Sequence, residues 1–340
     1  MSTTSQPTSF SDLYTDLQNR LHEATGVTAT ANQAKRSINT ALQDMHIGFD
    51  NQSPWAERDA TLITNKPYST GTVSVTNGST TVAGTATAWT SANSFGTNNA
   101  RTIGKIVING EPEVYTISAV GGATSITLNE RFVGATDGEA SYEYFEDEYA
   151  LASDFLRPLD IKYFDKNREV PIVGRNEFRR RYPRNKTPGT IKVSMVVDRP
   201  ASGNVTPIRR ILFHPPPNDF ILIPYTYITS RLAITSTGTT LTSLTSDSDE
   251  PIVPLRYRHA IVLHALYNQY RDDKDDDRAQ AVKEDYTQLM LRISGDHEVG
   301  TSRPQIRPRV SHYVRAAQRP YSGRGGRKHT LGSAFDEIRE

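Results

Sequence analysis

The sequence predicts an α+β fold. A helical bundle core, made of an N-terminal helical pair and a C-terminal helical pair, carries an inserted small antiparallel β-barrel or sandwich, a second β region and an extended basic C-terminal arm. Three observations predict it. Apolar residues recur at helical spacing near both ends, residues 69–145 have the alternating pattern of strands around Asn-Gly turns, and residues 301–331 have no hydrophobic periodicity. We expect a core at 1–66 and 146–300, a β-domain at 67–145 and the arm at 301–340.

The composition narrows the class of protein. The 340 residues include 39 Lys or Arg and 38 Asp or Glu, a net charge of +1, so the chain lacks the unbalanced charge of a disordered protein. Only 36% of residues are hydrophobic, which predicts a thin core or a surface that partners cover. The absence of cysteine excludes disulfides, thiolate metal sites and a cysteine nucleophile. We expect no membrane-spanning helix, because no run of about 18 apolar residues occurs, and no secretory signal, because the N-terminus has neither a basic n-region nor an apolar h-region.

The N-terminal helical pair is expected within residues 8–48. Ser9 or Ser11 can cap the first helix, because a hydroxyl accepts hydrogen bonds from the free N–H groups of a first turn. Thr30 and Gln33 resemble a capping box at the start of the second helix. The apolar face of the first helix consists of Phe10, Leu13, Tyr14, Leu17 and Leu21. The narrower stripe of the second consists of Ala31, Ala34, Ile38, Ala41, Leu42 and Met45.

The β-domain is predicted from its turns. Asn77-Gly78 and Asn109-Gly110 are hairpin signals, because both positions of such a turn must tolerate positive φ, and Gly121-Gly122 gives a third turn. Short strands at regular spacing favour a small antiparallel barrel or sandwich. We expect five aromatic side chains to fill its interior: Trp89, Tyr115, Phe132, Tyr142 and Tyr144.

Residues 146–235 are predicted to form the second β region. The apolar runs 211–213 and 221–223 indicate two buried strands around the Pro-rich turn 215–217. Pro251 and Pro254 precede the C-terminal helical pair, since a missing N–H costs nothing at a helix start. Four helices near 9–24, 30–46, 255–270 and 276–294 would each have one apolar face that needs a partner, so we expect the two pairs to pack together.

The arm from Thr301 to Leu331 carries eight cations and no acidic residue. Mutual repulsion and three prolines favour an extended, disordered free arm. Arg forks bind carboxylates and stack on aromatic rings better than Lys does. The cations are Arg303, Arg307, Arg309, Arg315, Arg319, Arg324, Arg327 and Lys328, and the apolar residues between them are Val310, Tyr313, Val314 and Tyr321.

No catalytic, cofactor or metal site is predicted, and we expect no enzyme. The eight histidines are scattered, without an HExxH or HxH pair, and no GxSxG or phosphate-binding glycine loop follows a strand. The acidic run Asp272–Asp277 lacks the glycine and closing glutamate of a calcium loop, which favours a solvated turn over Mg²⁺ or Ca²⁺ binding. Its aspartates would instead favour the start of the following helix.

A second basic group consists of Arg179, Arg180, Arg181 and Arg184, with Tyr182 among them. Three interpretations are open: contact with nucleic acid phosphates, a subunit contact, or a solvated loop. No known DNA-reading helix pattern accompanies the group, so sequence-specific DNA binding is not expected.

Three stretches resemble the head-tail adaptor proteins of tailed bacteriophages, also called connector or head-completion proteins. The first is the helical pair SFSDLYTDLQNRLHEA and ANQAKRSINTALQDMH, and the second is EDEYALASDFLRPLDI. The third is DEPIVPLRYRHAIVLHALYNQYRDDKDDDRAQAVKEDYTQLMLRI, in which Pro254, Tyr257, His259 and Ala260 match the family's Pro-led helix. The β-domain is similar to a small module of phage virion proteins, and it makes this chain longer than the minimal helical adaptors.

The resemblance implies a non-enzymatic, homo-oligomeric ring, usually a dodecamer, in the virion neck. The ring docks under the portal protein, extends the channel through which double-stranded DNA leaves without specific binding, and receives the next neck or tail protein; its subunits assemble in the host cytoplasm. Under this reading we expect an intersubunit or portal contact at Arg179, Arg180, Arg181 and Arg184, and tail-fibre contact is possible through the β-domain. The residues expected to bind the portal are Arg303, Arg307, Arg309, Tyr313, Arg315, Arg319 and Tyr321.

Other classes remain open. Another structural tail component, such as a nozzle, tail terminator or fibre-attachment protein, would suit the β-domain. A carbohydrate-active or nucleic-acid-processing enzyme is disfavoured because no acid and base pair can be assembled from the spacing. A cellular binding module is the remaining alternative.

Overall fold

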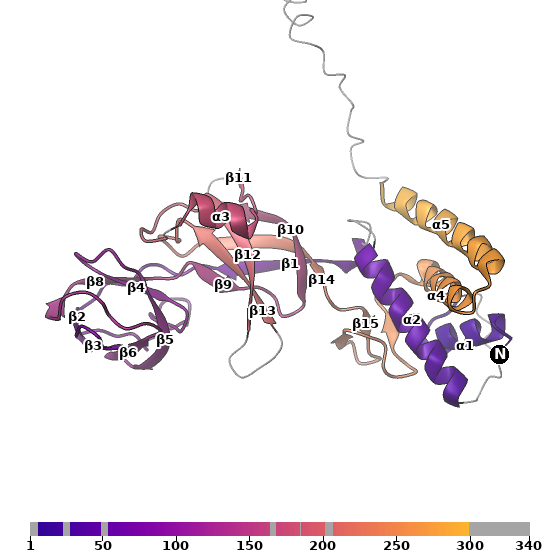
Figure 1. Ribbon diagram of the computed structural model, residues 1–340, viewed down its shortest axis with the longest axis horizontal. Coiled ribbons are helices and arrows are strands. Elements are labelled where there is room, and N and C mark those ends of the chain that lie inside the picture. The colour runs from indigo at the N-terminus through magenta and orange to yellow at the C-terminus, as the bar shows by residue number, and fades with distance from the viewer. Residues whose placement is uncertain are drawn as a thin grey trace, which may run out of the picture. The chain divides into compact units, whose positions relative to one another are not determined.

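The computed structural model describes residues 6–22, 28–48, 54–163, 168–183, 185–200 and 207–298 (Figure 1). The chain divides into two compact units, 1–286 and 287–340, and the elements below belong to the first unit, apart from the end of α5. The α-helices are α1 (Phe10–Arg20), α2 (Thr28–Gly48), α3 (Arg175–Arg181), α4 (His259–Asp272) and α5 (Asp276–Glu298).

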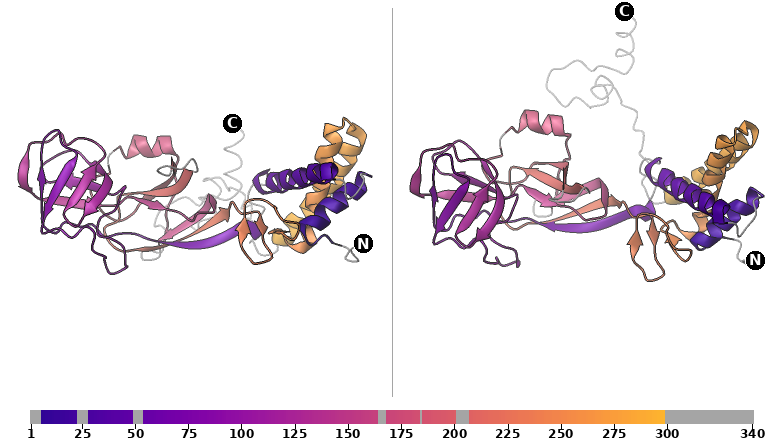
Figure 2. Two further views of the ribbon diagram at one scale, coloured as in Figure 1. Left: turned by 90° about the horizontal axis from the view of Figure 1, so that it is seen from below. Right: turned by 60° about the horizontal axis from the view of Figure 1, so that its bottom comes forward.

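Helices α1, α2 and α4 pack against one another, so segments from the two ends of the chain lie together (Figure 2). Helix α1 begins with a capping box, in which the Ser9 hydroxyl accepts from the Asp12 N–H and the Asp12 carboxylate accepts from the Ser9 N–H. The three helices meet through side chains that are almost fully buried: Leu13, Leu17, Ile38, Leu42, Ala260 and Ile261.

A buried arginine ties this helical group to the preceding chain. The Arg258 guanidinium donates to the carbonyl oxygens of Thr8 and Val253, and to the Glu250 carboxylate at 2.8 Å. The Phe10 N–H donates to the Asp249 carbonyl at 2.8 Å. This region carries a small sheet of order β16-β15-β17, made of β15 (Ala233–Ile234), β16 (Thr240–Leu241) and β17 (Glu250–Pro251).

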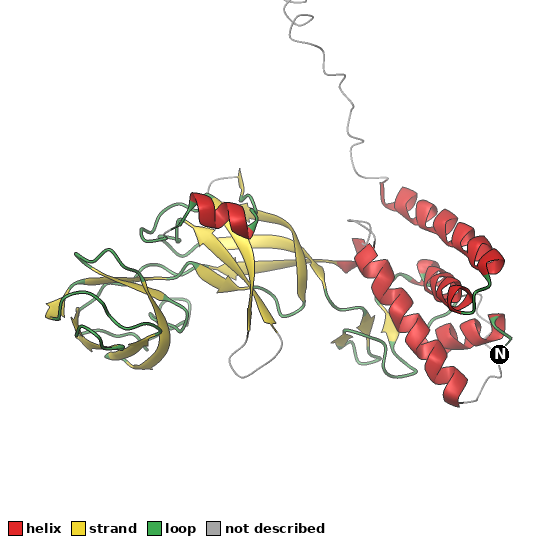
Figure 3. Cartoon of the chain, in the orientation of Figure 1, coloured by secondary structure: helices red, strands yellow, loops and turns green. Residues whose placement is uncertain are grey.

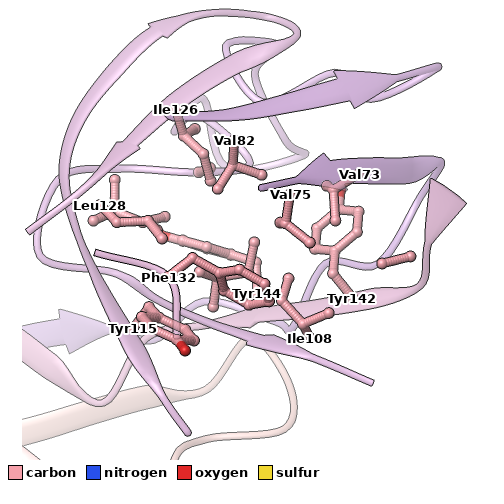
Figure 4. Close-up of a cluster of buried hydrophobic side chains, with 14 of the residues drawn as sticks. Val73, Val75, Val82, Ile108, Tyr115, Ile126, Leu128, Phe132, Tyr142 and Tyr144 are labelled. Atoms are coloured by element: carbon pink, nitrogen blue, oxygen red, sulfur yellow. The ribbon is translucent and has the colours of Figure 1, made fainter. Parts of the chain in front are cut away.

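A seven-stranded antiparallel sheet of order β7-β2-β3-β6-β5-β4-β8 curls into a half-barrel. Its apolar side chains point into the curl and form one core (Figure 4). All five aromatic residues expected to fill this interior are buried there, so that prediction is confirmed. The strands are β2 (Thr72–Val75), β3 (Thr81–Thr85), β4 (Lys105–Ile108), β5 (Tyr115–Gly122), β6 (Ser125–Leu128), β7 (Asp137–Ala140) and β8 (Tyr142–Phe145).

Two further sheets share a second core. One has the order β1-β14-β10-β11 and the other the order β12-β13-β9. Buried Tyr149, Phe213 and Ile223 come from both sheets and belong to the same cluster. The strands are β1 (Glu57–Ile63), β9 (Glu148–Ala150), β10 (Phe155–Tyr163), β11 (Arg168–Glu169), β12 (Val193–Pro200), β13 (Pro207–His214) and β14 (Leu222–Thr229).

The predicted fold class is wrong. The chain is α+β, but strands dominate it, and it is not a helical bundle core with a small β insertion (Figure 3). Strand β1 lies in a segment assigned to the helical core, and it pairs along its length with β14, Ile63 opposite Leu222. Helices show their periodicity locally, whereas a short strand gains its stability from a distant partner, so the sequence pattern understated the sheets.

The two strands predicted around the Pro-rich turn 215–217 differ from the expectation. The apolar runs at 211–213 and 221–223 do belong to strand regions, but they lie in different sheets, and Leu222 is 55% exposed rather than buried. Pairing partners, not hydrophobicity, decide which sheet a strand joins.

The expected domain boundaries at 66/67, 145/146 and 300/301 remain a prediction.

Candidate interaction surfaces

Helix α3 is held rigidly by its inner face. Phe178 is buried against Val193, Met195 and Leu212 of β12 and β13. The ring of Tyr182, just after the helix, stacks on His214 with the centroids 4.2 Å apart. Because the helix has only seven residues, this packing rather than helix propensity fixes its orientation.

The outer side of α3 forms an arginine face, defined here by Arg175, Arg179, Arg180 and Arg181. All four side chains are exposed. Arg181 forms an exposed i,i+4 pair with Glu177 at 3.2 Å, while Arg175, Arg179 and Arg180 have no ion-pair partner within the part of the chain that the structure describes. Three guanidinium groups are therefore available to an external anion.

The structure thus brings together three of the four arginines predicted as a contact, on one short helix. Arg184 lies outside the described residues. The portal-binding residues expected in the arm also lie outside them: Arg303, Arg307, Arg309, Tyr313, Arg315, Arg319 and Tyr321. Their role remains a prediction.

An exposed apolar surface, which the sequence reasoning missed, consists of Ile63, Phe95, Phe220 and Leu222. The rings of Phe95 and Phe220 lie 4.7 Å apart, and Ile63 is opposite Leu222 in the β1–β14 pairing. Phe95 is 50% exposed and Leu222 55%. Exposed apolar side chains that gather in this way are typical of interaction sites on soluble proteins.

The loop that presents Phe95 is organised by one side chain. The Asn93 carboxamide oxygen accepts from the N–H groups of Phe95 and Thr97, at 2.9 and 3.2 Å, and its amide nitrogen donates to the Thr97 hydroxyl at 2.6 Å. Gly96 at φ +74° completes the turn. The exposed aromatic ring is therefore built into the fold, and the Asn-Ser-Phe-Gly turn sequence was the available signal.

Three consecutive carboxylates, Glu146, Asp147 and Glu148, are buried where β8 leads into β9, and the sequence reasoning missed them as well. Each has a cation from a different strand or loop. Glu146 accepts from Nε and Nη2 of Arg101, and Asp147 accepts from Lys105. Glu148 accepts from Nε and Nη2 of Arg199 at 3.0 and 2.9 Å. A buried carboxylate is stable only when paired in this way, so the run joins the seven-stranded sheet to the second core.

The buried run also reaches the platform of α3. The Asn185 amide donates to Asp147 at 2.9 Å and to the Phe213 carbonyl at 2.7 Å, so its oxygen accepts from Nδ1–H of His214 at 2.8 Å. Burial lowers the pKa of His214, the ring on which Tyr182 stacks, and nearby Lys192 adds to this effect. The neutral His214 ring with its proton on Nδ1 therefore fits both the hydrogen bond to Asn185 and the stacking of Tyr182.

Outside these surfaces, the described residues carry a shallow hollow but neither a metal-binding group nor a membrane-spanning helix. A shallow hollow of about 280 Å³ lies over β1, β14 and β10, where Lys162 and Asp160 pair at 2.9 Å. Among the described residues, no three His, Asp or Glu side chains converge in a way that could hold a metal ion. Within the same ranges, no helix combines the length and the apolar character needed to cross a bilayer.

No protein-family model matches this sequence, and no curated protein matches it at a significant level.

Proposed function

We propose that the chain is the subunit of a ring adaptor between portal and tail in a tailed phage. The ring, a dodecamer by analogy with the family it resembles, would extend the DNA channel and dock the next neck or tail component. The observation that supports this proposal most is the position of the stretches that resemble the adaptor family. The N-terminal pair and the helix after Pro254 pack together as α1, α2 and α4, and the EDEYALASDFLRPLDI stretch supplies the buried carboxylates and the start of β10.

The exposed surfaces support an assembly subunit. A monomer gains nothing from a rigidly displayed Phe95 next to Phe220, whereas a subunit covers such a surface permanently. The arginine face of α3 likewise favours a charged partner. Both surfaces are held by buried contacts before any partner binds, which lowers the entropy cost of association.

The experiment is co-expression with the portal protein of the same phage, followed by native mass spectrometry. We expect a portal complex carrying twelve copies of this chain, and virions that contain the chain in the neck by electron microscopy. Particles made without the chain should fill with DNA but fail to retain it. A chain that never joins the portal, and is found elsewhere in the virion or not at all, contradicts the proposal.

Another tail component, such as a nozzle, terminator or fibre-attachment protein, is the second candidate. It is favoured by Phe95, because this residue lies in the segment predicted to be an inserted β-domain and is displayed for a partner. Binding to tail tube or fibre protein without binding to portal would support this alternative. Phe95→Ser is the variant to use, since the side chain is exposed and its loss should leave the fold intact.

A further inference from the structure

Among the described residues, one carboxylate, that of Glu177, pairs with the arginine face, so most of its positive charge is left unpaired there. Arg175 and Arg179 are one helical turn apart, about 6 Å along the axis, and Arg180 follows directly. Like charges at this spacing repel, and only Arg181 has a carboxylate within the described residues. Because Phe178 and Tyr182 anchor the helix, the arginines project from fixed backbone positions, and guanidinium forks suit carboxylates.

Its surroundings favour a protein partner over DNA. Glu177 lies within the face and exposed Glu169 precedes the helix, so phosphates would meet like charge. Ile172 is 37% exposed two residues before the helix cap, and an apolar side chain beside arginines is typical of protein interfaces. The arginine face, including Glu177, has a net charge of +3.

The same chain carries a complementary surface at the turn between α4 and α5, called here the acidic turn and defined as residues 272–278. It contains five aspartates against Lys274 and Arg278, a net charge of −3. Only Asp275 has an ion-pair partner in the described residues, Arg278 at 3.3 Å, and the other four aspartates are exposed. The turn is fixed by backbone hydrogen bonds, including Asp275 N–H to the Tyr270 carbonyl at 3.0 Å.

We propose that the arginine face of one subunit binds the acidic turn of a second copy. This rests on the proposed function, since it names the contact by which the subunits of the ring recognise each other. Two different patches that complement each other make a head-to-tail contact, and such a contact generates a ring when the rotation between successive subunits closes. Within the described residues neither patch is neutralised by its neighbours, and the two patches have equal and opposite net charge.

The test uses two charge-reversed variants of the full chain. The first is Arg179→Glu with Arg180→Glu. The second is Asp272→Lys with Asp273→Lys, which places cations at the C-terminal end of α4, where the helix dipole favours them. Ring formation with the portal is measured by native mass spectrometry at physiological salt. Each variant alone should lose at least about tenfold in assembled fraction, because like charges then face each other across the contact.

The decisive step is mixing. In a mixture of the two variants, acidic faces meet basic turns and basic faces meet acidic turns, so alternating rings should form with equal numbers of each variant. An even subunit number, as in a dodecamer, allows this. Combining all four substitutions in one chain should restore assembly too. Recovery in the mixture also shows that both variants fold.

Matched controls separate this contact from net charge and from DNA binding. Glu130→Lys with Glu139→Lys makes the same charge change as the Asp272→Lys, Asp273→Lys variant, at exposed positions just after β6 and on β7, and should assemble as the wild type does. Rings that survive both reversals, or a mixture that fails to recover, overturn the inference alone. Loss of salt-sensitive DNA binding with assembly intact assigns the arginine face to DNA and overturns it as well. Wild-type protein that never forms a ring overturns both this inference and the proposed function.

Discussion

Asn39 and Leu244 exchange two hydrogen bonds although 205 positions separate them. The Asn39 amide nitrogen donates to the Leu244 carbonyl at 3.0 Å, and the Leu244 N–H donates to the Asn39 carboxamide oxygen at 2.9 Å. The Asn39 side chain, on helix α2, thus pairs with the backbone of a loop through one donor and one acceptor, as one β-strand pairs with another. Since Leu244 is only 2% exposed, water cannot replace these bonds.

Asn39→Ala should lower the free energy of unfolding by about 1–3 kcal/mol, because it leaves a buried N–H and C=O without partners. Chemical denaturation measures the change. Asn32→Ala is the matched control, since Asn32 is exposed on the same helix and alanine is the better helix former there. Equal effects of the two substitutions would show that the paired hydrogen bonds add nothing.

Asp147→Ala should destabilise the protein by about 3–5 kcal/mol, because Asp147 is fully buried and its removal leaves Lys105 without its carboxylate. Asp198→Ala removes a carboxylate that pairs with Arg209 at 3.0 Å on the surface, and should cost less than about 1 kcal/mol. Urea unfolding of both variants tests the contrast. A cost for Asp147→Ala no larger than the surface cost would argue against the buried run as a structural junction.

Gly71→Ala should be much more damaging than Gly78→Ala, although the two glycines have nearly the same backbone, at φ +82° and +79°. At Gly78 a methyl group meets nothing within 4 Å, so only the left-handed conformation costs energy, about 1–2 kcal/mol. At Gly71 the added carbon would lie 2.3 Å from the Thr85 carbonyl oxygen, which adds about 1–3 kcal/mol of overpacking. Thermal unfolding of the two variants should separate the contributions, and equal melting temperatures would refute the close approach.

Stability should fall as the pH drops below about 6.5, the ordinary pKa of an unfolded histidine. Burial lowers the pKa of His46, nearby Arg157 lowers it further, and the hydrogen bond to the Thr229 carbonyl opposes them only in part. Burial also lowers the pKa values of His214 and His259. The unfolded chain therefore binds more protons in this range, and proton binding favours unfolding.

His46→Gln isolates one of these groups, because glutamine keeps an N–H donor but does not titrate. The slope of unfolding free energy against pH between about 5 and 7 should decrease, by at most about 1.4 kcal/mol per pH unit for one group. Urea titrations at several pH values give the slopes. An unchanged slope would mean that His46 does not contribute to the acid sensitivity.

The candidate surfaces were only partly visible in the sequence. The run of arginines at 179–181 is contiguous, so it could be named before its helix was known. Phe95 and Phe220 lie in separate loops, and only the folded structure, with the turn built by Asn93, brings their rings together. The acidic run at 272–277 was visible too, but only the structure shows that a single one of its aspartates, Asp275, has an ion-pair partner among the described residues.

The sequence by itself determined the features that depend on nearby residues: helices near 10–20 and 259–272, a serine cap at Ser9 or Ser11, and left-handed glycines at 78 and 110. The tertiary structure decided which strands pair, and therefore that sheets dominate. Strand β1 has a partner only because β14 returns to it, and Glu146, Asp147 and Glu148 are buried only because cations from other strands and loops reach them. Helix bonds and turns form within a few residues, whereas strand pairing and charge burial gain free energy only after distant segments meet.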